Sequence, residues 1–491
     1  MMDPALQEVI LSAAPSEEVE AVTLLRPGYD PPPPARAVAR FGPVVTCRLP
    51  AGAIVAVRND PAVISLKASR VVGAADAFIE SAALPYVGEW RRRPTGLRQR
   101  GSGVTLGVLD WGCDFAHPNF RRPDGSTRLL ALWDQRRPQR AANRFGYGTV
   151  YTREDIDRAL RSRDPYGTLG YHPAEAMSPG ALGTHGTHVM DIAAGSGSPE
   201  GIAPDTDLVF VHLAARNTPL IGGLGDSVRL LEGISFVQSV AGRAPWVCNC
   251  SLGRMGGDHT GQSIVERALD ALVEENPGCC IVLSAGNYFA KRAHAEGWVR
   301  PNGQARLEWM IDAGDPTSNE LEIWFSPRDR FEVEVRSPDG VAFSAGLDSA
   351  VDILSDGNTV GRLYHRAVDP VADAHHVDCF LSRDAPSGRW EVVLHGIDVV
   401  DGRYHAWIER DVPRPRAQSS FPERMSSPRC TIGTIAGGFR TICVGAVNPL
   451  TGQLGPFSSS GPLRSGRMKP DLVAPGVGIL AAGSTSRGAK P

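Results

Sequence analysis

Asp110 and His185 are the two residues of this sequence whose types and surroundings best fit acid–base chemistry. Asp110 ends an apolar run, and His185 lies at the start of the helix-like segment THGTHVMDIAAG. Near neutral pH an imidazole can take a proton from a hydroxyl, and a buried carboxylate beside it fixes the tautomer and stabilises the imidazolium. We therefore predict that His185 acts as a general base oriented by Asp110.

A metal site is the other chemistry that the histidines and cysteines could support. His188 follows His185 by three residues and shares its helix face, but no neighbouring carboxylate or Glu-x-x-His pattern completes a ligand set. The nine cysteines lie mostly in apolar runs such as WVCNCSL and GCCIVLSAG, which indicates buried free thiols. We expect no metal ligands and no cofactor for the chemistry; structural calcium stays open but has no support in the sequence.

The segments that carry these residues have the pattern of an α/β protein. Nearly continuous apolar runs are typical of strands buried on both faces of a parallel sheet, and helix-like segments lie between them. Functional side chains gather at the carboxyl ends of such strands, and Asp110 and Asn287 each end one. The predicted strands are Val104–Asp110, Thr206–Leu213, Trp246–Leu252 and Cys279–Asn287.

Changes of pattern along the chain predict four segments. Residues 1–95 read as a small α+β unit, and residues 96–296 as the first part of the α/β core. Residues 297–413 alternate polar and apolar positions, as in LEIWF and FEVEVRSPDG, which predicts an inserted all-β sandwich. Residues 414–491 return to the core and leave it incomplete. Within the insertion, the pair His375-His376 and the acidic residues around it could bind calcium or zinc, but we expect the pair to lie in an exposed turn.

Six stretches of the chain resemble, in order and spacing, the signatures of the subtilisin-like serine proteases, the peptidase S8 family. The resemblance spans roughly residues 100 to 491 and implies a parallel-sheet, three-layer core and a hydrolase that performs proteolysis with Asp, His and Ser in that chain order. The stretches are GVLDWGCDFAHPNF, THGTHVMDIAAG, CNCSLG, VLSAGN, FSSSGP and KPDLVAPGVGILAA.

The resemblance also implies a role for each residue that matches a motif. Asp110 is the expected orienting acid, His185 the general base and Asn287 the side-chain donor of the oxyanion hole. His188 matches the motif but is structural in the family. Trp111 departs from the family, which usually has a small hydroxyl residue there. The residues implied for substrate binding are Ser251, Leu252, Gly253, Ala285 and Gly286.

The serine nucleophile of the family lies in a Gly-Thr-Ser-Met-Ala motif that follows the APGV stretch. No such motif occurs within residues 1–491, and Ser484 and Ser486 come too early. We therefore expect the nucleophile beyond Pro491 and the 491-residue chain to be inactive by itself. The alternative is a non-catalytic relative, a pseudoprotease that binds peptides or regulates a partner.

The N-terminal unit and the insertion also have counterparts in the family. Residues 1–95 resemble an inhibitory propeptide, which assists folding and lays its tail through the cleft of the catalytic domain. The inserted sandwich resembles the jelly roll that some subtilases carry. The expected partners are a polypeptide substrate and the chain's own N-terminal unit.

Composition and charge exclude other classes of function. The formal net charge is -3, so nothing in the overall charge favours nucleic acid or an anionic membrane surface. The apolar runs are shorter than a membrane-spanning helix requires, and the first twenty residues lack the basic and long apolar regions of a secretory signal. We expect a cytoplasmic protein without nucleic-acid or membrane partners; secretion by another route stays open.

Overall fold

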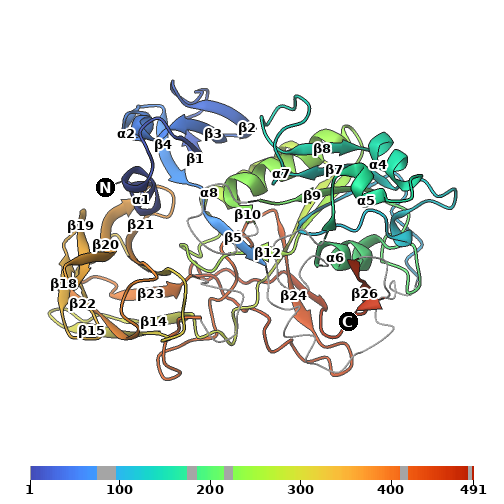
Figure 1. The fold of residues 1–491 in the computed structure, drawn as a ribbon. Helices are drawn as coiled ribbons and strands as arrows, with labels where there is room; N and C mark the ends of the chain where they lie inside the picture. Colours follow the sequence, from blue (N-terminus) through green and yellow to red (C-terminus); the bar gives the residue numbers. More distant parts are fainter. Residues whose placement is uncertain are drawn as a thin grey trace.

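A computed structural model describes residues 2–74, 96–173, 185–214, 225–409, 418–484 and 489–490. Figure 1 shows a central sheet with its helices, an N-terminal sheet above it and a β-rich part beside it. Across the described residues, no helix combines the length and the apolar character needed to cross a bilayer.

The N-terminal part is an antiparallel sheet of four strands in the order β2-β3-β1-β4, with two helices. Helix α1 begins after Asp3, whose side chain accepts a hydrogen bond from the backbone N–H of Leu6 and caps the helix. The elements are α1 (Pro4–Ser12), β1 (Glu18–Leu25), β2 (Arg36–Phe41), β3 (Val44–Pro50), α2 (Ile54–Asn59) and β4 (Val63–Ala68).

The central sheet has eight strands in the order β25-β24-β13-β11-β6-β9-β7-β8, and every neighbouring pair is parallel except β7 and β8. The predicted α/β class is confirmed. The strands are β6 (Thr105–Asp110), β7 (Leu129–Asp134), β8 (Thr149–Thr152), β9 (Asp207–His212), β11 (Trp246–Cys250), β13 (Cys279–Ser284), β24 (Ile442–Val447) and β25 (Leu472–Pro475).

Helices cover both faces of this sheet, which explains the nearly unbroken apolar runs of its strands. Leu106 and Val108 of β6 face one apolar cluster with α4 and α6, whereas Leu109 faces another with α7 and α8. The helices are α4 (Arg153–Leu160), α5 (Pro165–Leu169), α6 (His185–Ala194), α7 (Ser227–Ala241) and α8 (Ile264–Glu275).

The N-terminal sheet packs on α7 and α8 and shares their apolar cluster. Two buried, two-pronged ion pairs join it to α7. Arg48 of β3 donates to both carboxylate oxygens of Glu232 at 2.9 and 2.8 Å, and Arg229 donates to both oxygens of Glu20 in β1 at 2.9 and 2.6 Å. Because removal of one partner would leave a buried charge alone, these pairs fix how the N-terminal sheet sits on the core.

The β-rich part consists of two antiparallel sheets that enclose one apolar cluster. Their orders are β14-β23-β16-β21-β20-β19 and β15-β22-β17-β18. The strands are β14 (His294–Trp298), β15 (Gln304–Ile311), β16 (Asn319–Phe325), β17 (Arg330–Arg336), β18 (Ala342–Ala345), β19 (Ser349–Ser355), β20 (Asn358–Asp369), β21 (Ala374–Leu381), β22 (Gly388–Asp398) and β23 (Arg403–Ile408).

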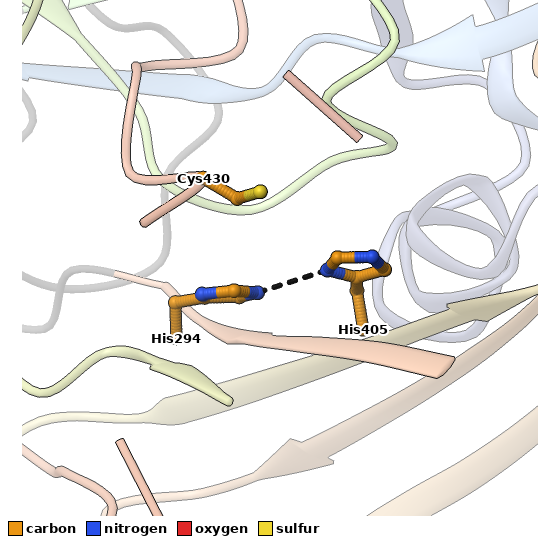
Figure 2. Close-up of side chains that lie close together, drawn as sticks. All are labelled: His294, His405 and Cys430. Carbon is orange, nitrogen blue, oxygen red and sulfur yellow. Dashed lines mark hydrogen bonds between the residues drawn. The ribbon is translucent and has the colours of Figure 1, made fainter. Parts of the chain in front are cut away.

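Histidines of this part lie in its interior. The prediction of an exposed turn at His375-His376 is wrong, because both residues lie on β21 and are buried, at 5% and 3% exposure. His294 of β14 and His405 of β23 form a second buried group with Cys430 (Figure 2). The nine cysteines form no disulfide, and all except Cys279 and Cys280 are buried, as predicted.

Three short strands connect the parts. Strand β5 (Val71–Ala74) leaves the N-terminal sheet and runs into the middle of the molecule (Figure 1). There it pairs in antiparallel fashion with β10 (Gly225–Asp226) and with β12 (Leu252–Gly253).

A further pair of short strands, β26 (Ala481–Ala482) and β27 (Ala489–Lys490), lies near α6. The backbone N–H of Ala482 donates to the carboxylate of Asp191 in α6 at 2.8 Å.

Candidate active site

Asp110 and His185 meet at the carboxyl end of the central sheet. Asp110 is the last residue of β6 and has no exposed surface, and His185 is the first residue of α6. The His185 Nδ1 lies 2.7 Å from Oδ1 and 2.9 Å from Oδ2 of Asp110. Because a carboxylate can only accept, Nδ1 carries the proton and the lone pair of the neutral ring is on Nε2. This is the tautomer that a general base needs.

The backbone between the two residues is fixed by the turn that follows β6. The N–H groups of Gly186 and Thr187, in the first turn of α6, donate to the carbonyls of Trp111 and Gly112 at 2.8 and 2.9 Å. A Cβ on Gly186 would lie 2.6 Å from the ring of Phe210, so the helix can approach the sheet this closely only with glycine there. The glycine of the THGTH motif therefore brings His185 to Asp110.

The indole of Trp111 covers the imidazole of His185. The two rings are stacked, with centroids 4.2 Å apart and an angle of 8° between their planes. Trp111 is buried, at 1% exposure, and its backbone N–H donates to Oδ1 of Asp110 at 2.7 Å. One residue thus orients both members of the pair. Sequence reasoning could not find this contact, and the only signal was the unusual size of the side chain at that position.

Tyr171 and His212 support the turn that follows β6, and sequence reasoning missed both. The hydroxyl of Tyr171 lies 2.9 Å from Nδ1 of His212 and accepts from the backbone N–H of Cys113 at 3.0 Å. Burial lowers the pKa of His212, the last residue of β9, to about 3, so this ring is neutral and can accept. Only the register of β9 beside β6 brings His212 to Asp110.

The VLSAGN motif forms β13 and the turn after it. Gly286 has φ 98°, a left-handed value that favours glycine, and Asn287 follows at 8% exposure. The FSSSGP stretch supports this turn, since Ser459 N–H donates to the Gly286 carbonyl and its hydroxyl accepts from Tyr288 N–H, both at 2.9 Å. Parallel strands end at one edge of the sheet, so Asn287 and Asp110 share that edge, with β11 between their strands.

The predicted substrate strand is already paired in this structure. Leu252 and Gly253 form β12, and their partners in β5 are Ala74 and Gly73. On its other side β5 pairs with β10, so it lies as the middle strand of three. Ser251, one residue before β12, is half-buried and accepts from the side-chain amide of Asn249 at 3.1 Å. A segment of the chain's own N-terminal part therefore covers the edge that was predicted to bind peptides.

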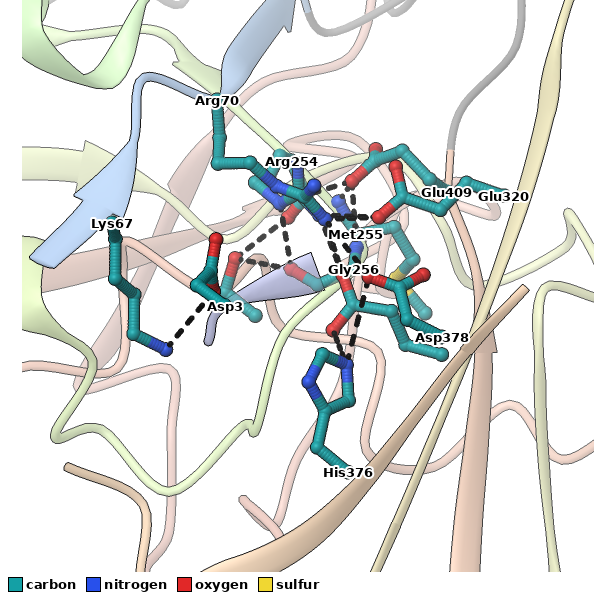
Figure 3. A network of polar contacts seen from close by, with 12 residues as sticks. Asp3, Lys67, Arg70, Arg254, Met255, Gly256, Glu320, His376, Asp378 and Glu409 are labelled. Carbon is teal, nitrogen blue, oxygen red and sulfur yellow. Dashed lines mark hydrogen bonds and ion pairs between the residues drawn. The ribbon is translucent and has the colours of Figure 1, made fainter. Parts of the chain in front are cut away.

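A buried charge cluster anchors the residue that precedes β5 (Figure 3). Arg70 and Arg254 both reach Glu322 of β16, at 2.9 and 2.7 Å, and both also pair with Glu320. Burial opposes ionisation of Glu322, but His376, whose Nε2 lies 3.2 Å from its carboxylate, and the two guanidinium charges hold the pKa of Glu322 well below the usual value. Sequence reasoning could not find this cluster, because its members come from four distant parts of the chain.

Comparison with known proteins indicates which family the chain resembles. Residues 101–309 match the family model of the subtilases, peptidase S8, which confirms the resemblance predicted from the motifs. The minor extracellular protease Vpr of Bacillus subtilis strain 168 is 24% identical over 419 residues, which cover 81% of this chain but only 43% of Vpr. The chain thus spans less than half the length of that relative.

A solved structure resembles most of the chain. The CspB protease of Clostridium perfringens has a TM-score of 0.67 and 25% identity, and the match covers 81% of this chain and 80% of CspB. The fold is therefore that of a subtilisin-like protease, including the predicted α/β core.

Proposed function

We propose, from the match of residues 101–309 to the subtilase family model, that the chain is part of a serine endopeptidase that uses Asp110 and His185. The single observation that carries the proposal is the contact of His185 Nδ1 with both carboxylate oxygens of Asp110. This contact supports a His185 ring that the buried carboxylate of Asp110 holds in the tautomer with its lone pair on Nε2.

The proposed chemistry is acyl transfer to a serine. His185 Nε2 takes the proton of the serine hydroxyl as the oxygen attacks the carbonyl carbon of the peptide bond, and later gives that proton to the leaving amine. Asp110 stabilises the imidazolium between these two steps. The side-chain amide of Asn287 donates to the oxyanion that forms on the carbonyl oxygen.

The serine hydroxyl has to come within hydrogen-bond reach of His185 Nε2. Residues 1–491 contain no Gly-Thr-Ser-Met-Ala motif, so we assign the nucleophile to sequence outside these residues. Residues 1–491 alone then lack peptidase activity.

We assign substrate binding to the two segments that flank the site. An extended peptide would pair with Ser251 and with β12, at Leu252 and Gly253. Ala285 and Gly286 would form the floor of the pocket that holds the substrate residue before the cleaved bond. The pairing of β5 with β12 supports this assignment, because β5 makes there the contacts that a bound peptide would make.

The same pairing supports the N-terminal part as an internal inhibitor. While β5 occupies β12, a substrate strand cannot pair there. The ion pairs of Arg48 and Arg229 with their glutamates hold the rest of the N-terminal sheet on α7. This part would also assist folding, because its apolar face completes the cluster that covers α7 and α8.

Covalent labelling of the complete gene product tests the proposal. A fluorophosphonate probe, which reacts with an activated serine, is expected to label one serine in the wild type and none in His185→Ala. The alternative function, a non-catalytic relative that only binds peptides at β12, needs no proton transfer. A complete protein that binds peptides but neither hydrolyses them nor reacts with the probe would establish that alternative.

A further inference from the structure

Three buried side chains outside the active site converge where the β-rich part joins the core. His294 begins β14, His405 lies on β23, and Cys430 belongs to the segment that returns to the central sheet; their exposures are 0%, 2% and 3%. One nitrogen of each histidine and the cysteine sulfur all lie within 4.8 Å of one another. Figure 2 shows the sulfur over the two imidazole rings.

The hydrogen bond of His294 defines its tautomer. The Nδ1 of His294 lies 3.3 Å from the carbonyl oxygen of Ser427, and a carbonyl can only accept. The proton is therefore on Nδ1, and the lone pair is on Nε2. That lone pair points at Nδ1 of His405, 3.0 Å away.

Neither neutral tautomer of His405 satisfies its surroundings. With the proton on Nδ1 it donates to His294, but its Nε2 then has no hydrogen-bond partner among the described residues and lies 3.9 Å from the carboxylate of Glu296. With the proton on Nε2 it faces Glu296 favourably, but two lone pairs then meet at 3.0 Å. A cation between the two ring nitrogens removes this conflict, because it accepts both lone pairs.

A proton shared by the two ring nitrogens would leave the sulfur of Cys430 outside the arrangement, although it lies within 4.8 Å of both. A metal ion differs from a proton because it gains a third ligand, the sulfur of Cys430. Two imidazole nitrogens and one thiolate are ligands that zinc prefers.

We propose that His294 Nε2, His405 Nδ1 and Cys430 Sγ bind one Zn²⁺ ion. On binding, the Cys430 thiol loses its proton to solvent and the sulfur bonds to the metal as a thiolate. The proton of His405 is then on Nε2, directed at the Glu296 carboxylate, while Nδ1 of His294 keeps its bond to the Ser427 carbonyl. The bond of His294 to the Ser427 carbonyl is of the kind that orients metal-bound histidines, whereas the Glu296 carboxylate is 3.9 Å from His405 Nε2. Two neutral imidazoles, one thiolate and Zn²⁺ carry one positive charge; the nearby carboxylate of Glu296 lies 3.9 Å from His405 Nε2 and also pairs with Arg403 at 2.7 Å.

The backbone around Cys430 positions the sulfur in advance. Cys430 has φ 54°, a left-handed value that is uncommon for a residue with a side chain. Its carbonyl accepts from the indole N–H of Trp407 at 2.9 Å, and the same indole stacks near both histidine rings, at 5.0 Å from His294 and 5.3 Å from His405. A zinc ion here would fasten β14 and β23 to the segment that leads back to β24.

A second buried group, Glu322, His376 and Asp378, has similar spacing but fits a metal less well. Its carboxylates already face the guanidinium groups of Arg70 and Arg254. Two fixed positive charges beside the group repel a divalent cation. The guanidinium charges of Arg403, Arg429 and Arg464 also act on the cluster of His294, His405 and Cys430, but none of its three ligands is a carboxylate that such a charge already binds.

Metal analysis of the purified 491-residue chain, grown with zinc and dialysed against a weak chelator, tests the proposal. We expect about one Zn²⁺ per chain in the wild type. In Cys430→Ser and in His405→Gln the zinc content should be lower by a factor of about ten or more. The matched control is Cys379→Ser, which changes a buried cysteine of β21 outside the cluster and should keep the zinc. Substitution with Co²⁺ should give a thiolate-to-cobalt absorption band in the wild type and in Cys379→Ser only.

The opposite results would contradict the proposed zinc site. A wild type with no more zinc than Cys430→Ser, or a cobalt protein without the thiolate band, contradicts the proposal. If the cluster variants do not fold, X-ray absorption of the wild-type zinc protein decides. One sulfur and two imidazole nitrogens around the metal support the site, and a shell without sulfur refutes it.

Discussion

The indole of Trp111 lies flat on the imidazole of His185, with ring centroids 4.2 Å apart. The same residue donates its backbone N–H to Asp110, so the acid and the base are both held by the turn that follows β6. In a family that usually has a small residue here, the bulk of Trp111 restricts the plane in which the His185 ring can turn.

This contact predicts a positioning role for Trp111. In the complete gene product, Trp111→Ala should lower kcat by about 10²-fold, because a freed ring departs from the geometry of proton transfer. Trp111→Phe keeps a flat ring and should stay within roughly tenfold of the wild type. Steady-state kinetics on a peptide substrate measure both, and equal kcat values in the two variants would show that the stack does not matter.

Asn287 gives a second prediction for the same enzyme. Asn287→Leu should lower kcat by about 10²–10³-fold with little change in KM, as expected when one oxyanion-hole donor is lost. Its amide would act on charge that develops only in the transition state. A variant with unchanged kcat would remove Asn287 from the mechanism.

The anchor of β5 predicts how the N-terminal part is released. Arg70→Ala removes a cation that pairs with Glu320 and Glu322, so β5 should leave β12 more readily. Basal peptidase activity of the uncleaved complete protein should rise by roughly tenfold or more. Arg36→Ala is the control, since the ion pair of Arg36 with Glu18 in the same part of the chain is exposed. Equal activity of the two variants would contradict an inhibitory β5.

Acid should weaken the contact between the N-terminal sheet and the β-rich part. Asp369 accepts from Lys67 at 2.7 Å and also pairs with Arg366. Burial opposes its ionisation, but these two charges hold its pKa well below the usual value. The folded-state pKa is thus lower than the unfolded one, so the pair stabilises the fold fully above about pH 4 and loses this effect as the pH falls further.

Thermal unfolding as a function of pH measures this contribution. The Tm of the wild type should fall more steeply below about pH 4 than that of Asp369→Asn, and the variant should be the less stable protein at pH 7. Parallel curves for the two proteins would show that Asp369 contributes nothing to the acid response.

The sequence was sufficient to predict the elements and residues whose structure depends on the local pattern of the chain. The four apolar runs became β6, β9, β11 and β13 because strands covered on both faces need apolar side chains at every position. Asp110 and His185 could be paired because each belongs to a motif with its own local geometry.

The residues that the sequence left unexplained are those that meet only in the folded chain. Arg70 and Glu322 are 252 positions apart, and His294 and His405 are 111 apart. The prediction of an exposed turn at His375-His376 is wrong because β21 is covered on both faces and its histidines lie in the interior. A polar residue in a buried strand contacts partners from distant parts of the chain. The polar and apolar pattern of the strand itself does not reveal those partners.

The most direct measurement of the central claim is the peptidase turnover of Asp110→Asn in the complete gene product. Asparagine keeps the shape of aspartate but presents an amide N–H, which favours the opposite tautomer of His185 and takes the lone pair away from Nε2. We expect kcat to fall by about 10⁴-fold at neutral pH, with KM and Tm close to those of the wild type. A kcat within tenfold of the wild-type value would contradict the assignment of His185 as a base oriented by Asp110.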